Sequence, residues 1–80
     1  MMLKPITSEK AVKMLELDNT LLFEAPLIED KESIAKEVES VFGVKVEKVR
    51  TMIKQNKKFA YVRLNKSTLA VDVAAKLGMI

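Results

Sequence analysis

The spacing of apolar residues first points to a helix in the middle of the chain. Within residues 31–42 the apolar positions fall at i, i+4, i+7 and i+8, and they are Ile34, Val38, Val41 and Phe42. This spacing places them on one face of an amphipathic helix. Asp30 can accept a hydrogen bond from the first turn, and Gly43 can adopt the left-handed conformation that ends a helix. The pattern therefore predicts a helix between Asp30 and Gly43.

A shorter helix and a strand are predicted before that segment. Thr7 offers an N-cap hydroxyl, and an apolar stripe continues to about residue 17 through Ala11, Met14 and Leu15. Residues 20–25 are nearly all apolar and end at Pro26. A short, continuous apolar run is typical of a strand that is covered on both faces.

Residues 44–64 alternate as the two strands of a hairpin. On one face the pattern places Val49, Thr51, Ile53, Ala60, Val62 and Leu64. A two-residue turn at Asn56 and Lys57 would pair Ile53 with Ala60, so that the apolar faces coincide. Arg50 would then lie opposite Arg63 on the other face, which would carry Lys48, Arg50, Met52, Lys54, Phe59, Tyr61 and Arg63.

The C-terminal segment predicts a last helix. Ser67 or Thr68 can cap it, and Gly78 follows as its stop. Its apolar stripe would be Leu69, Val73 and Leu77. With a short extended lead-in at residues 4–6, the elements predict one α+β domain over residues 1–80, with about four strands, mostly antiparallel, and three helices.

Composition restricts the chemistry of this domain. The chain has 80 residues, 49% of them hydrophobic and 31% charged, and it contains no His and no Cys. The commonest general base, the thiolate nucleophile and His/Cys zinc sites are therefore excluded. Thr7, Ser8 and Lys10 could be drawn as a nucleophile with a lysine base, but the sequence supplies no cavity for them. Glu29, Asp30 and Glu32 are better explained by the helix N-terminus than by a metal. We expect neither catalysis, nor a metal, nor a cofactor.

Charge is distributed unevenly along the chain. Residues 17–30 contain four acidic residues and no basic residue, whereas residues 43–66 contain eight basic residues and Glu47 as the one acidic residue. Basic side chains that alternate with aromatic rings suit nucleic acid, because cations neutralise phosphates and rings stack on unpaired bases. One alternative is that Phe59 and Tyr61 pack beneath a helix. Another is a small protein–protein adaptor with an acidic and a basic surface.

Three stretches together resemble the large-subunit ribosomal protein twenty-three family. They are Pro5 to Ala11, Asp30-Lys31 leading to Ile34, and Val41 to Val46. The strand at Val49-Arg50-Thr51, the strand from Ala60 to Leu64 and the C-terminal stretch from Asp72 to Ile80 continue the resemblance over nearly the whole chain. The short turn at Asn56 and the absence of a basic N-terminal extension are similar to archaeal members.

The resemblance implies a fold and a function. The fold would be a split β-α-β sheet, and the function would be binding of large-subunit rRNA at the rim of the polypeptide exit tunnel. The neighbouring protein would be ribosomal protein twenty-nine, and signal recognition particle would dock on the exposed surface, with Glu9 as an acidic docking residue. RNA contacts carried over by position are Thr7, Lys10, Lys31, Arg50, Thr51, Lys58, Tyr61 and Arg63.

The basic block extends that set of RNA contacts. Its further members are Lys48, Lys54, Lys57 and Lys66. With no apolar run long enough to span a membrane and no secretory h-region, we expect a cytoplasmic protein of the ribosome that is a monomer when isolated.

Overall fold

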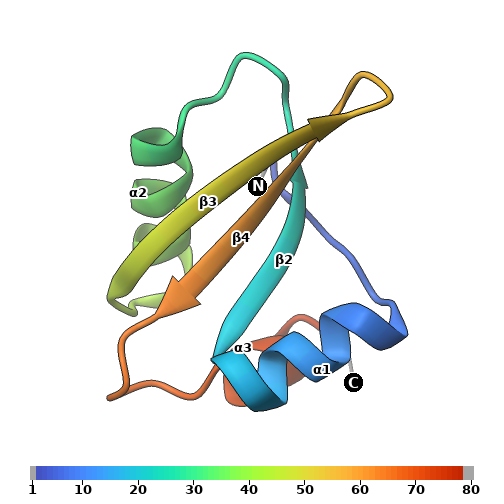
Figure 1. Cartoon of the computed structure of the whole chain (residues 1–80). Helices are drawn as coiled ribbons and strands as arrows, with labels where there is room; N and C mark the ends of the chain where they lie inside the picture. Colours follow the sequence, from blue (N-terminus) through green and yellow to red (C-terminus); the bar gives the residue numbers. More distant parts are fainter. Residues whose placement is uncertain (1, 79–80) are drawn as a thin grey trace.

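A computed structural model describes residues 2–78 of the chain. Within these residues the element order is β1 (Lys4–Pro5), α1 (Glu9–Asp18), β2 (Thr20–Ala25), α2 (Lys31–Phe42), β3 (Val46–Lys54), β4 (Lys57–Leu64) and α3 (Ala70–Lys76). The strands form one sheet in the order β1-β2-β4-β3 (Figure 1). Both β2 and β3 run antiparallel to the β4 strand that lies between them. They are therefore parallel to each other and joined through α2, which confirms the α+β class and the split β-α-β arrangement.

Helix α2 has the predicted bounds because its two caps are local. The Asp30 carboxylate accepts a hydrogen bond from the Ser33 amide at 2.8 Å, and Gly43 ends the helix at φ +64°. Ile34 and Val38 are fully buried against the sheet. Val41 is 52% exposed, so its predicted burial is wrong. The row that meets the sheet runs at i, i+4 and i+8, and Val41 lies to one side of it.

The hairpin register differs from the predicted one by two residues. The turn lies at Gln55 and Asn56, both with positive φ, and Lys54 pairs with Lys57. Two consecutive residues with positive φ are typical of a type I′ turn, whose twist matches that of the flanking strands. Because the shift is an even number of residues, each side chain keeps its predicted face. The predicted pairs are wrong, however, and Arg50 lies opposite Tyr61 instead of Arg63.

The main core lies between α2 and one face of the sheet, which we call the inner face. Its fully buried strand residues are Leu21, Phe23, Ala60 and Val62, each at 0% exposure. They belong to one apolar cluster with Ile34 and Val38 from α2 and with residues of α1 and α3. Strand β2 has the bounds that were predicted for it, residues 20–25, and five of these six residues are buried.

The two other helices lie together at one end of the sheet (Figure 1). Helix α1 begins one residue later than the Thr7 cap predicts, because Ser8 is the cap and its hydroxyl accepts from the Ala11 amide at 3.1 Å. Helix α3 is not capped by Ser67 or Thr68. The Ala70 amide donates instead to the Asn19 side-chain oxygen at 2.6 Å.

Asn19 lies between α1 and β2, and its side chain links this junction to the one between β4 and α3, which is far away in the sequence. Its side-chain nitrogen donates to the carbonyl oxygens of Leu64 at 3.2 Å, Asn65 at 3.4 Å and Thr68 at 2.9 Å. The helix that it caps buries Ala70, Val73 and Ala74, whereas Leu69, predicted for the apolar stripe, is 60% exposed. No helix within residues 2–78 is long and apolar enough to cross a membrane.

Candidate nucleic-acid interface

The sheet face that points away from α2 gathers basic and aromatic side chains. We call this the outer face, and its members on β2, β3 and β4 are Thr20, Leu22, Glu24, Lys48, Arg50, Met52, Phe59, Tyr61 and Arg63. Alternation along each strand sends these side chains away from α2, and Thr20 and Leu22 among them are also buried. Phe59 and Tyr61 are half-buried, and neither belongs to the main apolar cluster. The outer face is therefore the surface on which rings and cations meet.

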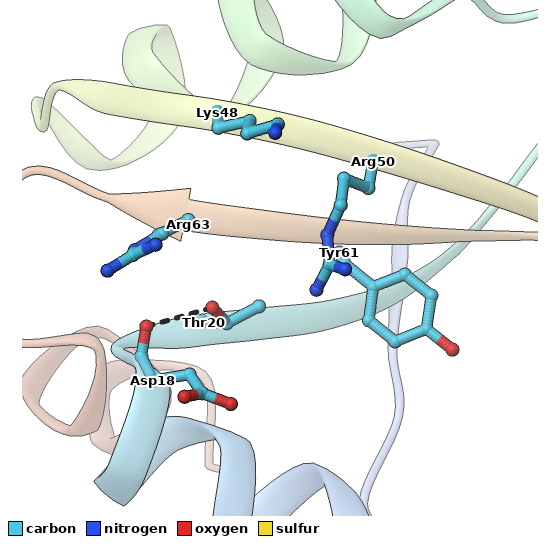
Figure 2. Close-up of a pocket in the computed structure, with 6 residues that line it drawn as sticks. All are labelled: Asp18, Thr20, Lys48, Arg50, Tyr61 and Arg63. Carbon is cyan, nitrogen blue, oxygen red and sulfur yellow. Dashed lines mark hydrogen bonds between the residues drawn. The ribbon is translucent and has the colours of Figure 1, made fainter.

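Arg50 and Tyr61 form the centre of the outer face. They are directly paired across β3 and β4, and the Arg50 guanidinium carbon lies 5.5 Å from the centre of the Tyr61 ring. A guanidinium over an aromatic face at this distance is a cation–π contact. The Arg50 side chain extends from β3 across the sheet toward Tyr61 (Figure 2).

A hollow of about 260 Å³ opens beside this pair, lined by Asp18, Thr20, Lys48, Arg50, Tyr61 and Arg63. Its basic residues come from adjacent strands, because Lys48 pairs with Arg63. The Arg63 Nε atom lies 3.9 Å from a carboxylate oxygen of Glu47, whereas Lys48 and Arg50 make no ion pair with any residue of 2–78. Two free cations thus border the hollow.

A second hollow, of about 550 Å³, connects the outer face to α1. It is lined by Lys10, Met14, Asp18, Arg50, Thr51, Met52 and Tyr61. Lys10, Met14 and Asp18 are four residues apart along α1 and therefore lie on one side of that helix. Six of the predicted RNA contacts line one or both of these hollows, namely Lys10, Lys48, Arg50, Thr51, Tyr61 and Arg63.

The other predicted contacts lie elsewhere. Lys54 and Lys57 pair at the hairpin turn, Lys66 lies between β4 and α3, Lys31 is the first residue of α2, and Thr7 precedes the α1 cap. The Lys58 ammonium donates to the backbone carbonyls of Leu27 and Glu29 in the loop between β2 and α2. Lys58 thus has a structural role in the chain itself. The predicted docking residue, Glu9, begins α1 with a side chain 90% exposed and 3.9 Å from Lys13.

Asp18 and Thr20 are the site residues that sequence reasoning missed. The Thr20 hydroxyl donates to the Asp18 carbonyl oxygen at 3.0 Å, so the two are held together at the junction of α1 and β2 (Figure 2). Their place beside Arg50 and Arg63 depends on β4 lying between β2 and β3. No local pattern around residue 18 encodes that strand order.

Comparison with known proteins identifies the family of this chain. Residues 1–75 match the family model described as Ribosomal protein L23. The chain belongs to this family. The resemblance drawn from the sequence motifs is thereby confirmed, and the chain is a structural constituent of the large ribosomal subunit. Members of the family are structural rather than enzymatic, and rRNA binding is typical of them. The partner of this chain is therefore the ribosome.

Proposed function

We propose that this chain binds large-subunit rRNA near the polypeptide exit tunnel through its outer face, with Lys48, Arg50 and Arg63 as phosphate contacts and Tyr61 as a stacking ring. The observation that carries the proposal is the pair of free cations, Lys48 and Arg50, beside an aromatic ring on an open hollow. Each cation that neutralises a phosphate releases counterions and so strengthens binding at low salt. Lys10, at the edge of the second hollow, extends the basic surface to α1.

Membership of the family supports this proposal. The pairing of like charges between β3 and β4 supports it as well. Lys48 lies directly across from Arg63, and Lys54 lies across from Lys57. Like charges opposite each other destabilise a strand pair. An RNA phosphate between such cations would convert this repulsion into attraction. The outer face is therefore expected to gain stability when RNA is bound.

The salt dependence of binding tests the assignment. We expect Lys48→Ala/Arg50→Ala to weaken binding to large-subunit rRNA and to reduce the slope of log K against log salt concentration by about 0.7 to 0.9 per lost phosphate contact. The measurement is a filter-binding or fluorescence titration across a range of salt. Lys13→Ala/Lys36→Ala is the matched control, because it removes the same charge from two helix positions where each lysine is ion-paired.

Equal slopes for the two double variants would contradict the proposal. If the protein instead shows no affinity for RNA and dimerises in a salt-sensitive way, the adaptor alternative would be favoured.

We also propose a docking surface for a nascent-chain factor such as signal recognition particle at the beginning of α1. Glu9 supports this because its carboxylate is almost fully exposed and lies on a different side of α1 from Lys10, Met14 and Asp18. A factor could therefore reach Glu9 while the outer face holds RNA. Ribosomal protein twenty-nine as a neighbour stays a prediction.

Charge reversal tests this docking role on intact ribosomes. Glu9→Lys is expected to reduce recruitment of the factor in a co-sedimentation assay. Glu32→Lys on α2 provides a control with the same charge change at an exposed, ion-paired glutamate. Unaltered recruitment by Glu9→Lys would count against the role.

A further inference from the structure

The hollow on the outer face contains one residue that phosphate binding does not explain. Asp18 is the last residue of α1, where the helix dipole disfavours a negative charge. It also lines the hollow with Lys48, Arg50 and Arg63, yet it makes no ion pair with any residue of 2–78. A carboxylate in this place repels phosphates and weakens the local field. Such a local conflict is expected where a residue has a specific task.

The position of Asp18 is held by the backbone. Its carbonyl oxygen accepts from the Thr20 hydroxyl, and Thr20 is 2% exposed. The next residue, Asn19, is anchored to the β4–α3 junction and Ala70 by its side-chain hydrogen bonds. Asp18 thus lies on a short rigid segment, and its carboxylate is directed away from the backbone atoms that hold it (Figure 2).

The size of the hollow limits the ligand. At about 260 Å³ it is slightly smaller than the roughly 300–1,000 Å³ of pockets for drug-sized molecules. It therefore suits a single nucleobase rather than a folded RNA element. The Arg50–Tyr61 pair offers a flat surface for such a base, because unstacked bases stack on aromatic rings and on guanidinium planes.

We propose that this hollow is a binding site for one unpaired guanine of the RNA, and that the Asp18 carboxylate is its reader. A carboxylate offers two acceptor oxygens side by side. The Watson–Crick edge of guanine presents two adjacent N–H donors, from N1 and N2, that match them. Guanine also carries the O6 acceptor on that edge, but adenine, cytosine and uracil present no two adjacent N–H donors there. With any of these three bases, one carboxylate oxygen would therefore face an acceptor. The chemistry of Asp18 therefore selects guanine.

The neighbouring cations complete the site. With the base stacked on the Arg50–Tyr61 pair, the phosphates on the two sides of this nucleotide would be neutralised by Lys48 and Arg63 and by the N–H groups of Arg50. This inference rests on the proposed function, since it requires RNA on the outer face. It goes further in naming the base that is read and the residue that reads it.

The test compares two RNA hairpins whose single-stranded loops differ only by one guanine or one adenine in a uridine context. The full chain is expected to prefer the guanine loop by roughly 5- to 150-fold, which corresponds to about 1–3 kcal/mol for a bidentate base contact. Asp18→Asn should abolish this preference while leaving binding to the adenine loop equal or tighter, because a repulsive charge is removed.

Glu16→Gln is the matched control. It neutralises an exposed carboxylate on the same helix that lines neither hollow. It should keep the guanine preference of the unchanged protein. If Asp18→Asn keeps that preference as well, Asp18 is not the reader and the inference is overturned.

The same experiment separates failure of this inference from failure of the proposed function. Equal, salt-sensitive binding of both loops by the unchanged protein, weakened by Lys48→Ala/Arg50→Ala, would overturn the guanine site and leave RNA binding intact. Failure to bind either hairpin, together with failure to bind large-subunit rRNA, would overturn both.

Discussion

The two faces of the sheet are built from the same strands and have opposite properties. On β4, Ala60 and Val62 are completely buried on the inner face, whereas Tyr61 and Arg63 between and beyond them lie on the outer face. On β2, Phe23 is fully buried. Helix α2 covers the inner face only. On the outer face β2 still buries Thr20 and Leu22, and it is the alternate positions of β3 and β4 that carry the charge.

This division has an energetic consequence. Like-charged pairs on the outer face, such as Lys48 opposite Arg63, lower the stability of the sheet in the absence of an anion. Apolar burial on the inner face must offset that loss, and it contributes about 25 cal/mol for each Å² removed from water. Substitutions on the inner face should therefore change the free energy of unfolding, while substitutions on the outer face should change RNA affinity.

The largest expected effect is that of Phe23→Ala. Phe23 is among the largest fully buried side chains, and its truncation should lower the free energy of unfolding by about 3–5 kcal/mol, measured by urea denaturation. Met52→Ala is the control on the outer face, where Met52 is 44% exposed, and should cost under about 1 kcal/mol. Similar losses for the two variants would contradict the distinction between the faces.

A smaller effect is expected at Asn19, which lies between α1 and β2. Asn19→Ala removes four hydrogen bonds, leaves the Ala70 amide without its partner and puts alanine at φ +52°. We expect a loss of about 1–3 kcal/mol in the free energy of unfolding. In Asn19→Gly, glycine adopts the positive φ without strain. This variant should therefore recover only the part of the lost stability that comes from backbone strain, and not the part that comes from the side-chain hydrogen bonds. Full recovery by glycine would show that the side-chain bonds contribute nothing.

Asn19 also illustrates which parts of the fold could be predicted from the sequence. Helix α2 was predictable because its signals are local, with Asp30 and Gly43 directly at its ends. The start of α3 was not, since its cap comes from a residue 51 positions earlier in the chain. The hydroxyls of Ser67 and Thr68 are plausible caps until the tertiary contact with Asn19 is known.

In the candidate site, too, local patterns could be predicted from the sequence and contacts between distant segments could not. Alternation along β3 and β4 was sufficient to place Arg50, Tyr61 and Arg63 on one face. Which of them are neighbours depends on the register, and the Gln55–Asn56 turn moved it by two residues from the prediction. The contribution of Asp18 and the structural role of Lys58 depend on how distant segments pack.

The smallest expected effect concerns Glu47, the acidic residue within the basic block. Its carboxylate lies 3.9 Å from the Arg63 Nε atom, and both side chains are about half exposed, so the ion pair should contribute no more than about 1 kcal/mol to stability. Glu47→Gln is therefore expected to leave the free energy of unfolding nearly unchanged. It should strengthen RNA binding a few-fold, because the Glu47 carboxylate no longer competes with the phosphate that Arg63 is proposed to contact.

Glu32→Gln sharpens this last prediction. It removes an ion pair that is more exposed, 3.6 Å from Lys36, on α2 and away from the outer face. The two variants change the net charge equally, so any general attraction of RNA to a more basic protein is the same for both. An increase in the salt slope of Glu47→Gln over that of Glu32→Gln would identify Arg63 as the cation released. Equal slopes would mean that Arg63 remains outside the RNA contact even without its acidic partner, and the boundary of the interface would then lie between Arg63 and Arg50.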